Sequence, residues 1–308
     1  MLRLTSFADL AALGKPVHLA LGVFDGVHLG HQAVIGRAVA ARAAGGLAGV
    51  LTFDPNPLKV IAPSKAPSKL LASLDHKAAI LGGFGVDLLL ALPFDATMAA
   101  MAAEDFIGEL VRAGAKTLVA GEDWRFGRGR AGDRGMLEKL ASTGDFRFEA
   151  VPPVMMDGER ISSTRIRQAI RDGNLSSAAA MLGRPYKVSG KVVQGRQLGR
   201  QLGFPTANLE KSEEQYPPDG VWAVWVRTAE GGCHPGVANL GIRPTVDEGE
   251  RSLEVHLIEG GRDLYGQVLE VEWVAWLRGE QRFSSLDELK GAIARDAAAA
   301  GALLGQGA

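Results

Sequence analysis

Hydrophobic positions in the first half of the chain form short apolar runs that alternate with stretches of helical spacing. Apolar runs without polar alternation are typical of strands in a parallel sheet that helices cover on both faces. We expect strands at His18–Phe24, Ala48–Phe53, Asp87–Leu92, Thr117–Gly121 and Phe146–Val151. Helices are expected at Gln32–Ala44, Leu74–Gly82, Glu104–Ala113 and Arg134–Ser142. The pattern predicts an α/β domain, and such sheets bind ligands beyond the carboxyl ends of their strands.

The pattern changes after about Gly183. From there on, polar and apolar residues alternate with period two, and Gly/Pro-rich turns rather than helices separate the segments. The alternating segments are Lys187–Val193, Val221–Thr228, Ser252–Ile258 and Val268–Leu277. Repeated short strands of this kind predict an antiparallel barrel or sandwich. We therefore expect domains at 1–183 and 184–308, with a last helix from about Ser285 through Asp296 and a frayed alanine-rich tail.

Composition limits the partners of the chain. Its 308 residues allow two domains that each bury a core. A net charge of −1 gives no overall attraction to nucleic acid or to an anionic membrane, so any phosphate site must be built locally. The single cysteine, Cys233, excludes an intrachain disulfide and a cysteine zinc cluster. We find neither a signal peptide nor about 18 consecutive apolar residues. We expect a cytoplasmic protein without nucleic-acid or membrane partners, monomeric or a weak homo-oligomer.

The segment Gly22–Gln32 (GVFDGVHLGHQ) carries the first candidate site. We expect the strand to end at Phe24, Asp25–Gly26 to turn, and a helix to start near His31, where backbone N–H groups favour anions. Attack on the α-phosphate of ATP needs positioning and charge neutralisation rather than a protein nucleophile. A zinc site and a purely structural role are the alternatives for the histidines. The candidate ATP-site residues here are Gly22, Phe24, Asp25 and Gly30, with His28 and His31 stabilising charge.

A second segment, Ile161–Arg167 (ISSTRIR), opens a helix that continues through Arg171. Its hydroxyl residues are good N-caps, which is a sufficient structural explanation for them. Two arginines in the first turn, however, oppose the helix dipole, and a bound anion would explain them. Ser163, Thr164 and Arg167 are therefore candidate phosphate contacts.

The loop Gly121–Gly135 is rich in arginine and contains a literal GxGxxG. Its glycines come several residues after the expected strand rather than in the tight turn, so we reject a dinucleotide fingerprint. We interpret the loop as a mobile basic segment over a triphosphate, with Arg125 as a phosphate contact. The chain contains no Walker A sequence, which excludes P-loop kinases and GTPases. Asn56, between two prolines, is either part of a rigid turn or a ligand contact.

The segment Gly190–Leu209 carries the second candidate site. Gly195, Gly199 and Gly203 predict a flexible flap whose backbone amides could cover phosphates. Thr206 and Asn208 point to the same side of an extended segment, so both oxygens can reach one Mg²⁺. A polar turn after a glycine-rich hairpin is the alternative.

Glu254 shares one face of its expected strand with Ser252 and His256. If the opposite, apolar face packs the barrel, Glu254 is a solvated strand carboxylate. If the strand lines the mouth of an active site, Glu254 is a candidate general base for a hydroxyl nucleophile. The alternation alone leaves both readings open.

In this order, the motifs resemble the bacterial bifunctional riboflavin kinase/FAD synthetase family. Gly22–Gln32 looks like the family's HxGH nucleotidylyltransferase signature, and Ile161–Arg167 like its second phosphate-binding motif. Gly203–Leu209 (GFPTANL) looks like its kinase metal motif. The run LEVHL followed by DLYG is similar to the strand that carries the kinase glutamate.

The resemblance implies a Rossmann-like adenylyltransferase domain followed by a six-stranded β-barrel kinase domain. It implies phosphorylation of riboflavin to FMN by ATP, then adenylylation of FMN to FAD with release of pyrophosphate. It makes Glu254 the kinase general base, and Thr206 and Asn208 the Mg²⁺ contacts. Candidate flavin contacts are Asn56, Asp123 and Arg278.

The chain departs from the family pattern at three aromatic or polar positions. Trp124 stands where Phe is usual, Trp222 where Tyr is common, and Asn56 where His is frequent. A single-activity enzyme, a non-catalytic flavin-binding regulator and a zinc hydrolase are the rival functions. A regulator would tolerate loss of Glu254 and of the metal-binding oxygens, and this chain retains them.

Overall fold

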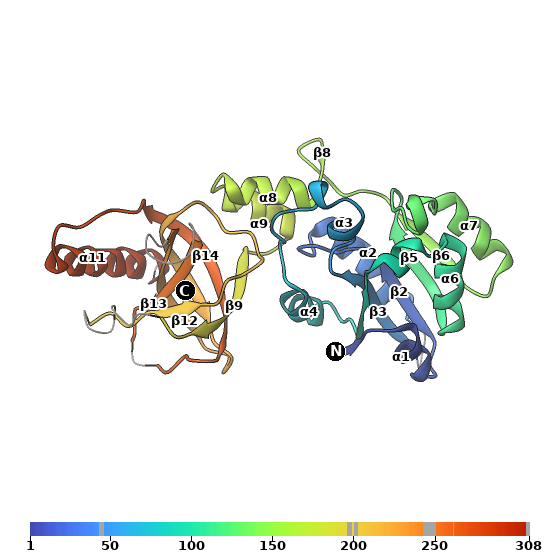
Figure 1. Ribbon diagram of the computed structural model, residues 1–308, viewed down its shortest axis with the longest axis horizontal. Helices are drawn as coiled ribbons and strands as arrows, with labels where there is room; N and C mark the ends of the chain where they lie inside the picture. Colours follow the sequence, from blue (N-terminus) through green and yellow to red (C-terminus); the bar gives the residue numbers. More distant parts are fainter. Residues whose placement is uncertain (43–45, 196–198, 200–202, 243–250, 261, 306–308) are drawn as a thin grey trace. The chain divides into compact units, whose positions relative to one another are not determined.

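The computed structural model describes residues 1–42, 46–195, 199, 203–242, 251–260 and 262–305 (Figure 1). By packing, the chain divides into two units. The first is Met1–Leu70 with Leu74–Ser163, and the second is Leu71–Ser73 with Thr164–Ala308. In the part of the chain that the structure describes, every helix is too short or too polar to cross a bilayer.

The first unit is built on a parallel sheet, with six strands among the described residues in the order β1-β4-β3-β2-β5-β6. Its strands are β1 (Leu2–Leu4), β2 (Val17–Leu21), β3 (Leu47–Asp54), β4 (Leu88–Pro93), β5 (Ala115–Gly121) and β6 (Arg147–Val151). The central strand β2 pairs with β3 on one side and with β5 on the other. The direction of winding therefore changes at β2, and its carboxyl end is the topological switch point where such sheets bind ligands.

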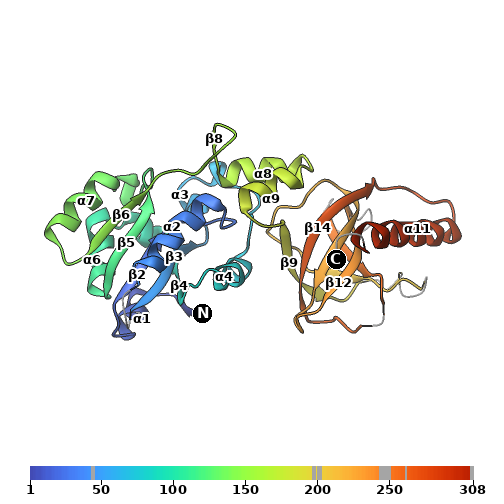
Figure 2. The ribbon, with the colours of Figure 1, turned by 180° about the vertical axis from the view of Figure 1, so that it is seen from behind.

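Helices cover both faces of this sheet, as Figure 2 shows from behind. On one face lie α1 (Phe7–Ala12), α6 (Ala103–Arg112) and α7 (Arg134–Thr143), which bury Leu10, Phe106 and Leu137 against the strands. On the other lie α2 (Leu29–Ala40) and α4 (Leu74–Gly82), which bury Ile35 and Leu81. The short elements are α3 (Pro57–Ile61), α5 (Ala96–Ala100), the 3-10 turns η1 (Pro63–Lys65) and η2 (Arg128–Arg130), and the hairpin β7 (Met155–Met156) and β8 (Glu159–Arg160).

The sequence prediction for this unit is confirmed for all five expected strands and four expected helices, and Leu74–Gly82 alone has both ends as expected. The strand expected to run to Phe24 ends at Leu21, because the backbone at Phe24 adopts φ +51° and cannot continue a strand. The helix expected from Gln32 begins at Leu29, and its expected end at Ala44 lies outside the described residues. The edge strand β1 was missed because it has three residues with little burial.

The second unit is built on a closed antiparallel barrel, with six strands among the described residues in the order β10-β13-β12-β11-β14-β9. Its strands are β9 (Lys187–Val193), β10 (Ala207–Leu209), β11 (Gly220–Arg227), β12 (Cys233–Ile242), β13 (Arg251–Leu257) and β14 (Val268–Arg278). The helices α8 (Ser163–Arg171, in this unit from Thr164) and α9 (Leu175–Leu182) precede the barrel, and α11 (Leu286–Gly305) follows it.

The last helix is longer than the sequence predicts. It continues to Gly305 because Ala300 and Leu304 are buried against Val221, Ala223 and Val237 on the outside of the barrel. Tertiary packing therefore stabilises the alanine-rich tail that we expected to fray. The strand β12 was not among the expected segments, since it contains Pro235 and Gly236, yet Cys233–Leu240 pair with β11.

Leu71–Ser73 belongs to the second unit, although the residues before and after it in the chain belong to the first. A buried carboxylate of the second unit binds this segment. Glu214, which is fully buried, accepts hydrogen bonds from Ser73 N at 2.8 Å and from Ser189 N at 2.9 Å. Packing thus places α8 and α9 with the barrel. The expected functional division at 183/184 places both helices with the first domain, and it stays a prediction.

Candidate active sites

The turn after β2 has an unusual backbone. Phe24 and Val27 adopt φ values of +51° and +44°, and Gly26, between them, adopts +82°. Non-glycine residues with positive φ are uncommon and are held in place by their surroundings. The turn lies at the switch point of the sheet and leads directly into α2, so the strain lies where a ligand would bind.

Side chains from four other places hold the carbonyl oxygens of this turn. Val23 O accepts from Thr52 Oγ1 at 2.8 Å and from Lys77 Nζ at 2.8 Å. Asp25 O accepts from Ser163 Oγ at 2.9 Å, and Val27 O accepts from Gln32 Nε2 at 2.9 Å. The carbonyl oxygens of Val23, Asp25 and Val27 therefore each accept a hydrogen bond from a side chain. These bonds fix the backbone conformation of the turn, and with it the positions of the backbone N–H groups and of the histidines.

The two histidines of the turn form a unit. His28 is the N-cap of α2, and its Nδ1 accepts a hydrogen bond from His31 N at 3.3 Å. The two rings stack with centroids 3.5 Å apart, and the Phe24 ring meets His31 edge-on at 5.3 Å. Because Nδ1 of His28 accepts, a neutral His28 carries its proton on Nε2, where it can donate to a phosphate oxygen.

Two glycines make room for these rings. A Cβ at Gly30 would lie 3.2 Å from the His28 ring, and one at Gly22 would lie 3.1 Å from the Phe24 ring. The His28 ring therefore fits because residue 30 has no side chain, and the Phe24 ring fits because residue 22 has none. The structure brings Gly22, Phe24, Gly30 and the two histidines together in this turn, and their expected ATP contacts stay predictions.

The ISSTRIR segment is linked to the turn through its first helical residue. Ser163 is the last residue of the first unit and donates to Asp25 O. Thr164 and Arg167 follow in α8 and belong to the second unit by packing. Their expected phosphate contacts stay predictions.

Lys77 was missed by the sequence analysis. It lies on α4 with only 6% of its surface exposed, and its Nζ donates to Val23 O and, at 3.2 Å, to Thr52 Oγ1. Burial lowers the pKa of Lys77 from 10.5 to about 8, against the attraction of Asp25 and Asp54. The signal was available, because Lys77 occupies the same helical face as Leu74, Ala78 and Leu81.

The arginine-rich loop after β5 packs more closely than a mobile segment would. Phe126 and Gly132 form an isolated bridge, Arg128 N donates to Met101 O at 2.8 Å, and a Cβ at Gly127 would lie 2.6 Å from Ala103. Arg134 pairs with Glu122 and Glu138. Arg125 is exposed and donates to Trp124 O at 3.3 Å, so its guanidinium remains available at the surface.

Two expected flavin contacts of the first unit have structural partners. Asn56 is the N-cap of α3, and its Oδ1 accepts from Leu58 N at 3.0 Å. Asp123 forms an ion pair with Arg160, which lowers the pKa of that carboxyl. Neither arrangement tests a ligand contact, and both roles stay predictions.

In the barrel, the second candidate site lies across adjacent strands. Asn208 on β10 and Asn239 on β12 are both direct register partners of Glu254 on β13. Residues opposite one another in paired strands point to the same face of a sheet. The apolar face of β13 is buried through Leu253 and Val255, so Asn208, Glu254 and Asn239 form a polar row on the outside of the barrel.

Two glycines of the expected flap lie against the predicted metal-binding residues. A Cβ at Gly195 would overlap the Asn208 side chain, and one at Gly199 would overlap Phe204 O and lie 3.2 Å from Thr206 Oγ1. Gly203, with φ +88°, turns the chain into the Phe204–Pro205 segment. The rest of the expected flap, 196–198 and 200–202, lies outside the described residues.

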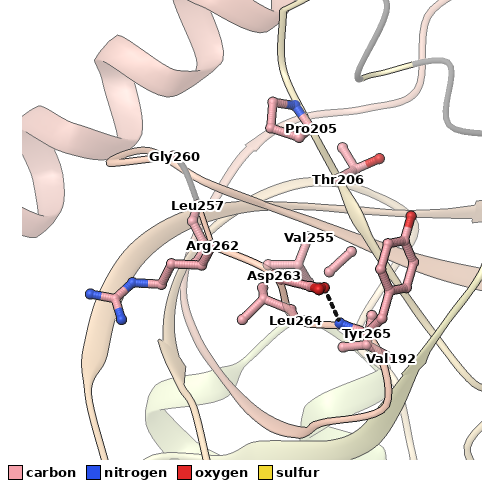
Figure 3. Close-up of a pocket in the computed structure, with 11 residues that line it drawn as sticks. Val192, Pro205, Thr206, Val255, Leu257, Gly260, Arg262, Asp263, Leu264 and Tyr265 are labelled. Carbon is pink, nitrogen blue, oxygen red and sulfur yellow. Dashed lines mark hydrogen bonds between the residues drawn. The ribbon is translucent and has the colours of Figure 1, made fainter. Parts of the chain in front are cut away.

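A pocket of about 430 Å³ opens beside Thr206 (Figure 3). In the close-up, Thr206 and Tyr265 stand on one side and Arg262 extends from the other. Tyr265 N donates to Asp263 Oδ1 at 3.1 Å, which fixes the loop before the exposed tyrosine ring. The lining residues are Val192, Pro205, Thr206, Ala207, Val255, Leu257, Gly260, Arg262, Asp263, Leu264 and Tyr265.

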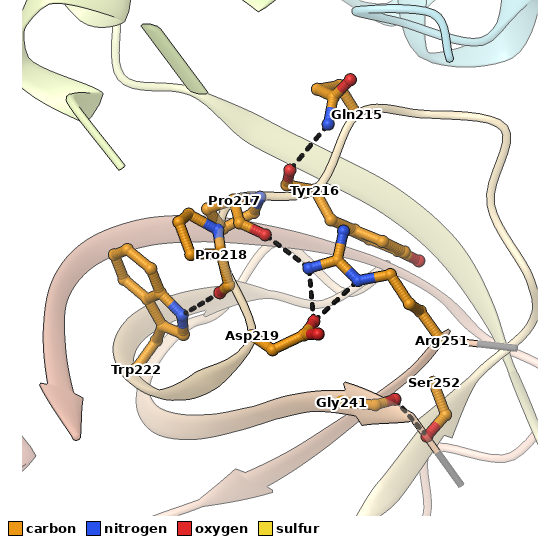
Figure 4. Close-up of polar contacts among 9 residues, drawn as sticks. All are labelled: Gln215, Tyr216, Pro217, Pro218, Asp219, Trp222, Gly241, Arg251 and Ser252. Atoms are coloured by element: carbon orange, nitrogen blue, oxygen red, sulfur yellow. Dashed lines mark hydrogen bonds and ion pairs between the residues drawn. The ribbon is translucent and has the colours of Figure 1, made fainter. Parts of the chain in front are cut away.

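Two further residues that the sequence analysis did not single out hold the strands of this site. His256 Nδ1 donates to Pro205 O at 2.9 Å, and its ring meets Phe204 edge-on at 5.5 Å. Arg251 donates to Asp219 Oδ1 at 2.7 Å and to Pro217 O at 2.6 Å (Figure 4). Both ends of β13 are therefore fixed on either side of Glu254.

Arg278, the third expected flavin contact, forms a bidentate ion pair. Its Nε and Nη2 donate to Asp296 of α11 at 3.0 and 2.7 Å. The guanidinium also lies 5.7 Å from the centroid of Phe283. Arg278 thus ties the last strand to the last helix, and a flavin contact there stays a prediction.

Comparisons with known proteins assign a family to each half of the chain. A family model described as FAD synthetase matches residues 12–165, and one described as riboflavin kinase matches residues 182–304. The bifunctional riboflavin kinase/FMN adenylyltransferase of Escherichia coli K12 is 43% identical over 281 residues, covering 90% of each chain. This chain belongs to the bifunctional riboflavin kinase/FMN adenylyltransferase family.

Other family members match over similar lengths. The proteins of the same name from Pseudomonas fluorescens and Bacillus subtilis are 41% and 34% identical, over 92% and 90% of this chain and 91% and 89% of theirs. A crystal structure from Streptococcus pneumoniae, titled as a macrolide-efflux protein, is 33% identical with a TM-score of 0.80 and covers 96% of both chains. The predicted fold, an α/β unit followed by a six-stranded barrel and a last helix, is confirmed.

Proposed function

We propose that this chain makes FAD in two ATP-dependent steps at two separate sites. The first step phosphorylates riboflavin to FMN in the barrel, and the second adenylylates FMN to FAD at the switch point of the parallel sheet. The observation that carries this proposal is that a FAD synthetase family model matches residues 12–165 and a riboflavin kinase family model matches residues 182–304. ATP, riboflavin and FMN are the substrates of the family.

In the kinase step, Glu254 acts as the general base. It takes the proton of the riboflavin 5′-hydroxyl while that oxygen forms a bond to the γ-phosphorus of ATP and the bond to the β-phosphate oxygen breaks, releasing ADP. The position of Glu254 supports this role, because it lies in a polar row on the outer barrel face beside Asn208. The anchors at Arg251 and His256 hold its strand on both sides.

The residues beside Glu254 suit a magnesium ion. Asn208 is 8% exposed, and Gly195 and Gly199 leave space at Asn208 and Thr206 that a Cβ would fill. Thr206 and Asn208 would hold the ion through neutral oxygens, because Mg²⁺ completes its shell with water and substrate phosphates. When bound there, it supplies positive charge against the phosphate oxygens.

The pocket beside Thr206 is our proposed site for the adenosine part of the kinase ATP. Its walls combine apolar side chains of β9 and β13 with Tyr265, as expected for an aromatic base. Thr206, one of the two proposed Mg²⁺ contacts, lines this pocket.

In the adenylyl-transfer step, a phosphate oxygen of FMN attacks the α-phosphorus of a second ATP and pyrophosphate leaves. No protein nucleophile is needed, so the residues act by neutralising charge. His28 donates from Nε2, and His31, Ser163, Thr164, Arg167 and Arg125 are the proposed further contacts, together with the amides at the start of α2.

We propose residues 1–183 as this domain and 184–308 as the kinase domain, with Asn56, Asp123 and Arg278 as flavin contacts.

A time course with riboflavin, ATP and Mg²⁺, separated by chromatography, tests the proposal. FMN that accumulates and then gives way to FAD supports both sites and their order. FMN alone would mean that the first unit does not adenylylate, and conversion of added FMN without use of riboflavin would mean that the barrel is inactive. Fluorescence quenching of either flavin without ATP consumption would instead support a flavin-binding regulator.

A further inference from the structure

The turn that presents His28 and His31 depends on one carbonyl oxygen. Val23 O accepts two hydrogen bonds, from Thr52 at the end of β3 and from Lys77 on α4. The next residue, Phe24, has φ +51°, and the two donors fix the peptide group that sets this angle. The Phe24 ring then lies over Gly22 and against His31. A continuous set of contacts therefore joins the Lys77 ammonium to the catalytic imidazole pair.

Burial of the Lys77 ammonium disfavours its charged form and lowers its pKa. Its ammonium is removed from water and is held by one carbonyl and one hydroxyl, with Asp25 and Asp54 attracting it from the ends of β2 and β3. Buried charges are frequently replaceable by apolar residues of similar shape without loss of stability. Val23 O would also keep Thr52 as a donor if Lys77 were lost, so no buried carbonyl would be left unsatisfied.

We propose that Lys77 is a positioning residue for adenylyl transfer, which acts with Thr52 through the Val23 carbonyl to hold Phe24 and the histidine pair in their reactive arrangement. This inference rests on the proposed adenylyltransferase function. In this role Lys77 does not touch the substrate. It acts by keeping the imidazole rings of His28 and His31 in position during the reaction. A displacement of about 1 Å in a catalytic group can lower the rate by about 10²-fold.

The test uses the full-length protein and four variants. Lys77→Met removes the ammonium and keeps the length of the side chain, and Thr52→Val removes the second donor with little change of shape. The double variant removes both donors, and Lys116→Met, at an exposed position of β5, is the matched control. For each, kcat and KM are measured for FMN to FAD, kcat for riboflavin to FMN, and the thermal unfolding of the whole protein.

For Lys77→Met we expect kcat for FAD formation to fall about 10- to 100-fold while KM for ATP and FMN stays within about threefold. At neutral pH, riboflavin phosphorylation and thermal unfolding should match those of the wild type. Thr52→Val should lower the same kcat about threefold to tenfold, and the double variant should lose more than the product of the two, because Val23 O then has neither donor. Lys116→Met should change none of these values.

Several results would overturn the proposal. Wild-type kcat for FAD formation in Lys77→Met is one, and a rise in KM at constant kcat, which indicates a substrate contact, is another. If the first unit of Lys77→Met fails to fold, Thr52→Val decides, and a wild-type kcat in that variant contradicts the role of the carbonyl. A wild-type protein that forms FMN but no FAD would instead refute the proposed adenylyltransferase function itself.

Discussion

Asn208 and Glu254 are direct register partners across β10 and β13, and both face the outside of the barrel. The residue pair joins the proposed metal-binding segment to the proposed general base without any intervening side chain. Because adjacent paired residues have Cβ atoms roughly 5 Å apart, Asn208 would hold the ion close to the hydroxyl from which Glu254 would take the proton. This relationship makes the two kinase roles separable by mutation.

Replacing Glu254 with Gln should abolish the kinase step alone. The amide keeps the size of the side chain but cannot take the proton of the 5′-hydroxyl, so kcat for riboflavin to FMN should fall by about 10²- to 10⁴-fold. Conversion of FMN to FAD should be unchanged, since it takes place in the other unit. Asp287→Asn, at an exposed position of α11, is the control. Loss of both activities in a folded protein would contradict two independent sites.

Replacing Asn208 with Ala should change the dependence of the kinase on Mg²⁺. Loss of the amide oxygen weakens the metal contact, so the Mg²⁺ concentration for half-maximal riboflavin phosphorylation should rise by about tenfold or more. A Mg²⁺ titration of both activities checks this, with adenylyl transfer as the internal reference. An unchanged titration curve with a lower maximal rate would show that Asn208 positions Glu254 rather than the ion.

Two substitutions of His28 should separate its structural role from its chemical role. His28→Ala removes the N-cap of α2 and should lower the free energy of unfolding by about 1 kcal/mol, whereas His28→Asn retains a capping oxygen. Both should lower kcat for FAD formation, by about 10²-fold or more, because neither donates from the position of Nε2. If His28→Asn retains wild-type activity, the histidine acts only as a cap. Chemical denaturation and FAD assays of both variants provide the measurement.

The stability of the first unit should depend on pH through Lys77. Its pKa is about 8 in the folded protein and 10.5 in the unfolded chain, because burial opposes the charge more than Asp25 and Asp54 favour it. Between these values the unfolded chain binds more protons, so the free energy of unfolding rises with pH. Relative to Lys77→Met, the wild type should gain about 3 kcal/mol from below pH 8 to about pH 10.5.

Denaturant unfolding of the two proteins at several pH values measures this difference. Other lysines and tyrosines titrate equally in both proteins, so their effects cancel. Lys116→Met, whose position is exposed, should follow the wild type at every pH. The free energy of unfolding of the wild type minus that of Lys77→Met should therefore rise with pH. A value that stays constant, or that falls as pH rises, would contradict a buried ammonium at this position.

The elements that the sequence predicted well are those whose burial pattern is local. Leu74–Gly82 is helical with the expected bounds, because its apolar residues recur at helical spacing. Lys187–Val193 likewise has the expected bounds of a strand. The errors occur where packing overrides local preference. Pro235 and Gly236 lie inside β12 because strands on both sides pair with it, and the alanine-rich tail is helical because the barrel buries one of its faces.

By itself, the sequence determined the order of the two folds and the family to which the chain belongs, because these depend on residue type and spacing along the chain. Only the tertiary structure decided how separate segments combine. Strand pairing places Glu254 opposite Asn208, 46 residues away along the chain. Helix packing brings Lys77 to the carbonyl of Val23, to which Thr52 also donates. The physical reason is that register and carbonyl partners are set by sheet pairing and helix packing, which involve residues too distant for any local pattern to specify.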